Sequence, residues 1–430
     1  MRDNLYWLWL SLSCKPSVAN MLLQKFDHPY DIYRADAERI KAAVPPRFHR
    51  SVARLLEKDL VPAQRTMDHC FMQGIGIMTL GSISYPSALK QISVPPVVLY
   101  YRGRLFNFDK EFMISVVGAR EMSEYGEKVA FTIAHDIVRA GGIVVSGLAR
   151  GIDGVSSAAA LSVKGKGVKT VAVLGSGIDR IYPPEHKKLA DSVVKQGMLL
   201  SEYPPSSPPS PYHFPERNRI ISGLSAGTLV VEGGEKSGAL ITAQQALDEN
   251  RRVFAVPGNI DAGKSFAGNY LIQRGAKVVT CADDILDSFP KNQLRNVDIS
   301  RLLLPNAVDR KEVIDFYGVV SETSDKKSRR RTQDKIAYIP SADDDSFIDT
   351  PSFTVAASPV AEPRKSEILP PPNLDGDQLT VYRALTENGI TADEVSEKCG
   401  VPLAKVMTVL TMLEVLGCTE LIPGARYRKK

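Results

Sequence analysis

Hydrophobic residues in the first 75 positions recur at the three- and four-residue spacing of helices, and no strand-like alternation interrupts them. The residues that carry this spacing are Leu22, Leu23, Phe26, Ile32, Ile40, Val52, Leu55 and Leu56. A stripe of the same kind near the N-terminus consists of Leu5, Leu8, Trp9 and Leu12. The pattern predicts a small helical domain over residues 1–75.

From about residue 112, short apolar runs alternate with stretches of helical period. The runs are MISVVG, GIVVSG, TVAVLG, MLLSE, TLVVEGG and RVFAVPG, and a further strand, VVLYYRG, precedes them. Because these runs are apolar throughout, each strand is expected to be buried on both faces. The pattern predicts an α/β fold over residues 76–290: a doubly wound, mostly parallel, extended Rossmann-like sheet with helices on both faces.

Residues 291–375 differ in composition from the rest of the chain. They contain the basic run KKSRRR at 326–331, three consecutive aspartates at 343–345 and many prolines. Such a segment cannot bury enough apolar surface to fold, so a flexible linker is predicted.

Residues 376–430 again show helical spacing and are expected to form three helices followed by the strand-like tail CTELIPGARYRKK, as in a winged-helix domain. Thr391 and Glu394 fit a capping box at the second helix, and Pro402 suits the first turn of the third. Gly417 would end that helix, whose only basic side chain is Lys405. Base reading needs more polar side chains, so a protein-binding or auxiliary nonspecific DNA module is favoured over a sequence-specific regulator.

The 430 residues include 54 Lys or Arg and 49 Asp or Glu, a net charge of +5 that permits an anionic partner without establishing one. The five cysteines are odd in number and form no C-x-x-C pair, as expected in a reducing cytoplasm. The apolar run at residues 4–13 is short and lacks a cleavage motif, and no run reaches the roughly 20 residues of a membrane helix. We therefore expect a cytoplasmic protein without a membrane partner.

The loops that follow the predicted strands contain the most informative residues, because ligands bind beyond the carboxyl ends of strands in open parallel sheets. Glycines there let backbone amides approach phosphate, and Ser237 followed by Gly238 is placed to open a helix whose N-terminus attracts anions. Four arginines are expected to face the same crevice: Arg120, Arg150, Arg217 and Arg219. This combination predicts an extended polyanion as the ligand.

Phe214 lies in a proline-rich stretch between Tyr212 and Arg217. An aromatic ring beside phosphate-binding arginines could stack on a nucleic-acid base, which is worth about 1–3 kcal/mol and tolerates any sequence. The alternative is that Phe214 only packs beneath its own loop.

Dinucleotide binding is disfavoured, because Gly175–Arg180 lacks the third glycine of the fingerprint and follows the third strand instead of the first. GLSAG at 223–227 matches G-x-S-x-G, but its helix and strand come in the wrong order for a nucleophile elbow. The six histidines include no zinc-type spacing. Neither a catalytic residue nor a metal or other cofactor is predicted.

One enzymatic alternative remains open. Gly258–Ser265 (GNIDAGKS) satisfies the P-loop pattern and lies between the strand VFAVP and a plausible helix. This strand is the last of about six, and the candidate Walker B strand TLVVE ends in Glu232 instead of an aspartate. A coincidental match is favoured, with a P-loop or Rossmann-like nucleotide-binding enzyme as the alternative.

The ordered set of motifs resembles the DNA-processing protein A family (DprA, also called Smf). The resemblance covers residues 74–280 and includes VGAREMSEYG, SGLARGIDGVSSAAAL, VAVLGSGIDRIYPPEH, LLSEYPP, FPERNRIISGLSAGTLVVEGGEKSGALITAQQAL and VFAVPGNIDAGKSFAGNYLIQRGA. It implies a non-catalytic homodimer that binds single-stranded DNA, loads the recombinase RecA and helps displace single-strand-binding protein in natural transformation. A sterile-alpha-motif-like N-terminal domain and a C-terminal winged helix are common in that family.

The resemblance also assigns residues to the DNA site. Gly118 and Arg120 fall at the family's phosphate-binding turn, although Ala119 replaces its usual Ser or Thr. Together with the loop glycines, the predicted DNA-binding set is Gly118, Arg120, Gly147, Arg150, Gly175, Phe214, Arg217, Asn218, Arg219, Ser237 and Gly238.

Overall fold

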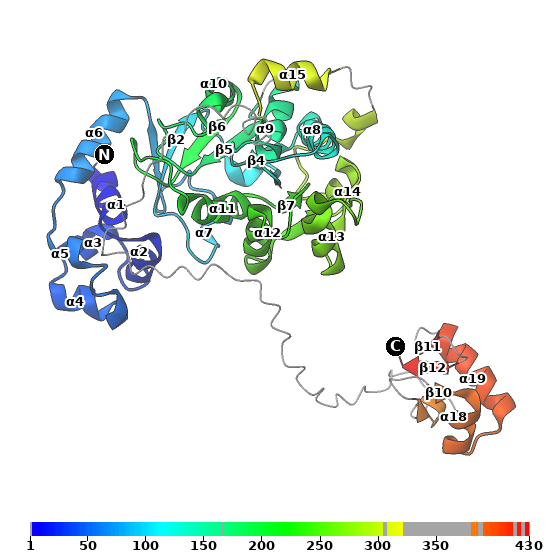
Figure 1. The fold of residues 1–430 in the computed structure, drawn as a ribbon. Coiled ribbons are helices and arrows are strands. Elements are labelled where there is room, and N and C mark those ends of the chain that lie inside the picture. Colours follow the sequence, from blue (N-terminus) through cyan, green and yellow to red (C-terminus); the bar gives the residue numbers. More distant parts are fainter. Residues whose placement is uncertain are drawn as a thin grey trace. The chain divides into compact units, whose positions relative to one another are not determined.

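The computed structural model describes residues 2–165, 167–303, 308–320, 380–382, 384–385, 390–415, 419–422 and 426–429. The chain forms two compact units, Met1–Lys335 and Ile336–Lys430 (Figure 1). The first unit contains the N-terminal helices and the large sheet, and the second contains the C-terminal helices and strands.

The N-terminal part is helical, as predicted. Its helices are α1 (Arg2–Ser13), α2 (Pro16–Leu23), α3 (Pro29–Arg34), α4 (Ala37–Ala42), α5 (Ala53–Leu56) and α6 (Val61–Met72), with a 3₁₀ turn η1 at Pro46–Phe48. Trp9, Leu8 and Leu22 are almost fully buried in a cluster that also contains Tyr100 of the sheet. The helices therefore share a hydrophobic core with the sheet. A sterile-alpha-motif-like arrangement stays a prediction.

The sheet has nine strands in the order β1-β2-β6-β5-β4-β3-β7-β8-β9. Only the β1–β2 and β2–β6 pairs are antiparallel, so the predicted mostly parallel, doubly wound α/β fold is confirmed. The strands are β1 (Gly76–Thr79), β2 (Val98–Gly103), β3 (Met113–Val117), β4 (Ile143–Ser146), β5 (Thr170–Leu174), β6 (Met198–Ser201), β7 (Gly227–Val230), β8 (Arg252–Ala255) and β9 (Lys277–Val278).

Helices cover both faces of the sheet. Successive side chains of a strand point to opposite faces and therefore pack against different helices. Ile114 and Val116 of β3 join the cluster that includes the N-terminal helices, whereas Met113 and Val117 join the cluster on the other face. The first face carries α8 (Glu124–Arg139), α9 (Ile152–Ser162), α10 (Lys187–Gln196) and α14 (Ala282–Leu286). The second carries α7 (Ser87–Lys90), α11 (His213–Leu224), α12 (Gly238–Asp248) and α13 (Phe266–Gln273).

Part of the range predicted as a linker is folded. Helix α15 (Arg310–Tyr317) lies within the range 291–375, and Ile314, Tyr317 and Val319 are buried against the first face of the sheet. Its Asp309 N-cap accepts from two backbone amides of the first turn. Residues 291–375 as a whole have few hydrophobic residues, so their composition did not predict a helix that is held by only a few buried apolar side chains. Residues 321–379, including KKSRRR, lie outside the described residues.

The second unit contains α18 (Ala392–Cys399), α19 (Leu403–Val415) and a three-stranded sheet of order β10-β12-β11. These strands are β10 (Ile390–Thr391), β11 (Thr419–Ile422) and β12 (Arg426–Lys429). The predicted capping box is present: Glu394 N donates to Thr391 Oγ1, and Thr391 N donates to a Glu394 carboxylate oxygen 2.9 Å away. Helices followed by a β-ribbon agree with the predicted winged helix. Gly417 lies outside the described residues.

Among the described helices, none is both long and apolar enough to cross a membrane.

Candidate nucleic-acid interface

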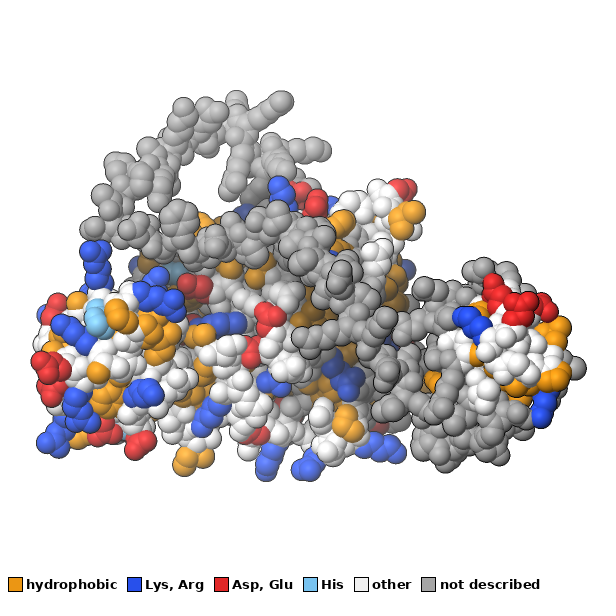
Figure 2. All heavy atoms as spheres, turned by 90° about the horizontal axis from the view of Figure 1, so that it is seen from below, with side chains coloured by type: hydrophobic (Ala, Val, Ile, Leu, Met, Phe, Trp, Pro, Cys, Tyr) orange, Lys and Arg blue, Asp and Glu red, His pale blue; other side chains and the backbone are white. Residues whose placement is uncertain are grey.

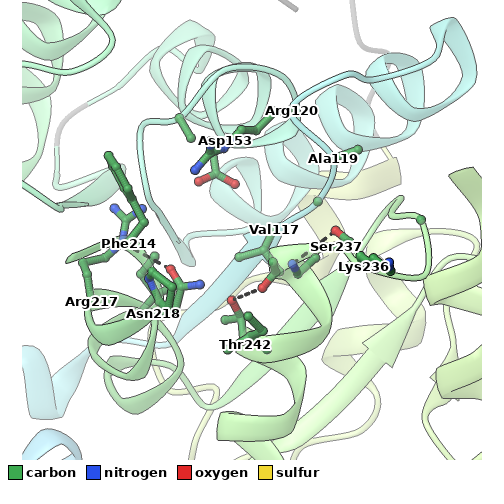
Figure 3. Close-up of a pocket in the computed structure, with 18 of the residues that line it drawn as sticks. Val117, Ala119, Arg120, Asp153, Phe214, Arg217, Asn218, Lys236, Ser237 and Thr242 are labelled. Atoms are coloured by element: carbon green, nitrogen blue, oxygen red, sulfur yellow. Dashed lines mark hydrogen bonds between the residues drawn. The ribbon is translucent and has the colours of Figure 1, made fainter. Parts of the chain in front are cut away.

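A pocket of about 540 Å³ lies where the connections of the sheet reverse direction. Strand β3 has β4 on one side and β7 on the other, so the loops after β3 and β7 diverge and leave a crevice at the carboxyl edge. Figure 3 shows the residues that line it. Seven of the predicted DNA-binding residues line this pocket: Gly118, Arg120, Phe214, Arg217, Asn218, Ser237 and Gly238.

The turn after β3 needs glycine because α9 begins directly behind it. A Cβ atom at Gly118 would lie 2.6 Å from Cγ1 of Ile152, the first residue of α9. Ile152 N in turn donates to Ala119 O at 3.2 Å. This packing fixes the turn so that Ala119 and Arg120 border the pocket.

The opposite wall is the N-terminus of α12. Ser237 caps the helix by accepting from Ala239 N, and Gly238 has no heavy atom within 4 Å of the position of a Cβ atom. Lys236 is exposed at the same rim. An open helix N-terminus beside a lysine favours an anionic ligand at this wall.

Arg217 was predicted to face the crevice, but the structure buries its side chain beneath the crevice floor. Its side chain is only 3% exposed, and its Nη1 donates to the carbonyl oxygens of Gly147 and Val173. Burial lowers the pKa of Arg217 to about 10, an effect that Asp153 opposes. The guanidinium therefore organises the floor of the pocket.

Asp153 is the nearby anion, and it is also buried. Its Oδ2 accepts from Gly147 N at 3.0 Å, and burial raises the pKa of this carboxyl to about 6 despite the opposing effect of Arg217. A Cβ atom at Gly147 would lie 2.4 Å from Arg217 Nη2 and 2.6 Å from Asp153 Oδ2. Gly147 thus makes room for the two charged groups, and it lines a second, small pocket beside the first.

Phe214 lies in the first turn of α11, not on a loop as predicted. Its half-buried ring packs over Gly175, where a Cβ atom would lie 2.8 Å from Phe214 Cδ1, and against Tyr182 at 5.6 Å between ring centroids. The exposed Arg120 has its Cζ 5.3 Å from the centroid of the same ring. Phe214 and Arg120 line both pockets and therefore separate them.

The other two arginines do not converge on the larger pocket. Arg150 lines only the small pocket, and its Nε donates to Glu185 Oε1 at 2.8 Å. Arg219 lines neither pocket, and its Nη2 donates to both carboxylate oxygens of Glu202, at 2.6 and 2.8 Å. The prediction of four arginines in one crevice is therefore wrong: Arg217 and Arg219 point to different sides of α11, and Arg150 is paired with Glu185.

Two residues of the pocket were not singled out from the sequence. Asp153 ends the run SGLARGID and is the second residue of α9, where an aspartate shortly after Arg150 and Gly151 was a signal for a buried charge partner. Lys236 precedes the Ser237 cap and could have been found as the cation nearest to the predicted helix start.

The GNIDAGKS segment forms a loop and the 3₁₀ turn η4 (Gly263–Ser265) before α13. The amides of four residues in and after this loop donate to protein oxygens: Gly258, Ala262, Ser265 and Ala267. In a P-loop such amides surround phosphates. Their internal partners favour the interpretation of GNIDAGKS as ordinary loop chemistry.

Glu232, the candidate Walker B residue, is buried and engaged in capping α8. Its Oε2 accepts from Ser123 N at 2.9 Å, and a Cβ atom at Gly126 would collide with its carboxylate. Among the described residues, no group of three or more His, Cys, Asp or Glu side chains could hold a metal ion.

Comparison with known proteins agrees with this geometry. Residues 76–290 match the family model of DNA recombination-mediator protein A, and residues 365–425 match the DprA winged helix domain. The chain is 45% identical over 223 residues to the DNA processing protein DprA of Bacillus subtilis, covering 52% of this chain and 74% of the relative. It is 30% identical over 433 residues to the protein Smf of Synechocystis, covering 98% of each chain.

A solved structure shares the fold. The X-ray structure of DNA processing protein A from Streptococcus pneumoniae superimposes with a TM-score of 0.58 and 33% identity, covering 67% of this chain and 98% of that one.

Proposed function

Because this chain belongs to the DNA recombination-mediator protein A family, we propose that it binds single-stranded DNA at the carboxyl edge of its sheet and passes that strand to a recombinase. The protein would act without chemistry of its own, in the cytoplasm. The observation that carries the proposal is the pocket between the β3 turn and the start of α12, with Arg120, Lys236 and the α12 N-terminus around an open space.

The proposed contacts are to the DNA backbone and not to particular bases. Arg217 and Asp153 oppose each other in the floor, so Arg120, Lys236 and the helix N-terminus would attract phosphate against the one further acidic lining residue, Glu121. The half-buried ring of Phe214 would stack a base beside the phosphates. Such a site would tolerate any sequence and lose affinity steeply as salt increases.

The first experiment compares fluorescence anisotropy of labelled oligo-dT and of a matched duplex, across a salt series, with and without ATP. We expect tight, salt-sensitive binding of the single strand that ATP does not change. Preference for the duplex would instead support a winged-helix regulator, and dependence on ATP would support the P-loop enzyme.

We further propose that the chain acts as a homodimer, loads RecA onto the bound strand and helps to displace single-strand-binding protein. The expected result is that the purified protein shortens the lag before RecA hydrolyses ATP on single strands coated with single-strand-binding protein. An unchanged lag would leave a DNA-binding protein without mediator activity.

The change Arg120→Ala should lower the affinity for oligo-dT by about tenfold. It removes one exposed cation from the pocket, so the slope of log affinity against log salt should also decrease by about 0.7. Arg295→Ala is the matched control, because Arg295 is exposed in a groove at the opposite, amino edge of the sheet beside Met113 and Ala226. Equal losses in both variants would contradict the assignment of the site.

The change Phe214→Leu should lower the affinity about tenfold while the salt slope stays that of the wild type. Leucine keeps an apolar side chain over Gly175 but cannot stack a base, and no charge is removed. The salt titration thus separates this variant from Arg120→Ala. Unchanged affinity would mean that Phe214 only packs beneath the site.

A further inference from the structure

Charge is unevenly distributed in the N-terminal helical part. Between Arg39 and Arg54 there are five Lys or Arg and no Asp or Glu, whereas the rest of residues 1–75 has six basic and eight acidic residues. The positive residues therefore gather in one short stretch, which runs from α4 through η1 to α5.

All five side chains of this stretch are exposed. We refer to them as the α4–α5 cations: Arg39, Lys41, Arg47, Arg50 and Arg54. Among the described residues, none of them forms an ion pair with a carboxylate. In Figure 2, Lys and Arg side chains are spread over the helical part at the left of the view.

Contacts within the stretch connect its segments. His49 and the Lys41 carbonyl oxygen are 3.1 Å apart, which ties the end of η1 to α4. Arg47 lies over the ring of its neighbour Phe48, with Cζ 5.0 Å from the ring centroid. The apolar residues of the stretch point inward, since Ile40, Val44, Val52 and Leu55 are buried.

Five cations within sixteen residues that contain no Asp or Glu give this stretch a positive potential, which attracts an anionic partner. An acidic protein would be the other candidate, but protein interfaces are built around apolar and aromatic anchors. No large hydrophobic side chain is exposed between Tyr30 and Val61. A phosphate backbone requires no such anchor.

We propose that the α4–α5 cations are a second contact for the backbone of the single strand, outside the pocket at the sheet edge. The inference rests on the proposed function, since it extends the path of the same DNA strand. A strand long enough to reach both surfaces would bind more tightly than one that fills the pocket alone.

The test removes three of these charges in the full-length protein by Lys41→Gln, Arg47→Gln and Arg50→Gln together. A matched control removes three exposed charges elsewhere in the same part, by Lys15→Gln, Lys25→Gln and Arg65→Gln. Both variants have the same net charge. Anisotropy is measured with oligo-dT of about 12 and about 45 nucleotides at several salt concentrations.

We expect the variant that lacks three α4–α5 cations to lose about tenfold in affinity for the long strand, with a salt slope lower by about 2. It should bind the short strand like the wild type. The control variant should change the affinity by less than about twofold. Equal losses in the two variants, or no loss in the variant that lacks three α4–α5 cations, would overturn the inference. The proposed function is tested separately, since it fails if the wild type binds neither strand, or if Arg120→Ala leaves the affinity for the short strand unchanged.

Discussion

The change Gly238→Asp is expected to lower the affinity for single-stranded DNA by about 100-fold while the protein remains folded. Gly238 begins α12 and lines the pocket, and a Cβ atom there would meet no other atom within 4 Å. The new carboxylate would stand where we place a phosphate, and two negative charges a few ångströms apart near a protein surface repel by up to about 4 kcal/mol.

The same substitution should not destabilise α12. Aspartate in the first turn of a helix interacts favourably with the helix dipole, and glycine there gives up conformational freedom on folding. Thermal unfolding should therefore show a midpoint at or above that of the wild type. Gly238→Ala is the control, and it should bind oligo-dT within about threefold of the wild type. If Gly238→Asp also binds normally, the phosphate does not lie at the start of α12.

Much of this site could be predicted from the sequence because its parts are local. An apolar run followed by glycine marks the end of a buried strand, and the carboxyl ends of parallel strands meet at one edge. Gly118, Ser237 and Gly238 come together for that reason, although more than 100 residues separate the first from the others. The capping box at Thr391 was predictable on the same grounds, since both of its hydrogen bonds form within four residues.

The directions of side chains were not predictable from the sequence alone. Arg217 and Arg219 are two residues apart on α11, so one enters the floor beneath Gly147 and the other reaches Glu202. Which arginine is buried depends on how α11 packs on the sheet, and this is a tertiary contact. Helix α15 was missed for a similar reason, because its few apolar residues matter only where they meet α9.

The change Arg217→Met should lower the free energy of unfolding at pH 8 by about 3–5 kcal/mol. Methionine fills part of the space of the side chain but leaves the buried Asp153 without its cation, and breaking a buried pair on one side is strongly destabilising. Urea unfolding monitored by circular dichroism measures the loss. Adding Asp153→Asn to Arg217→Met should recover part of it, because no uncompensated charge then remains.

The loss should also depend on pH in a definite direction. In the wild type, burial raises the pKa of Asp153 from 3.8 to about 6, so the folded protein holds this proton more tightly than the unfolded chain does. The contribution of Asp153 to stability is therefore fully present below about pH 4 and is lost as the pH rises to about 6. Arg217 opposes the effect of burial, so its removal should raise this pKa further and let the decline continue above pH 6. Arg217→Met should thus cost less at pH 5 than at pH 8, and a loss of equal size at both would show that the guanidinium does not stabilise the Asp153 carboxylate.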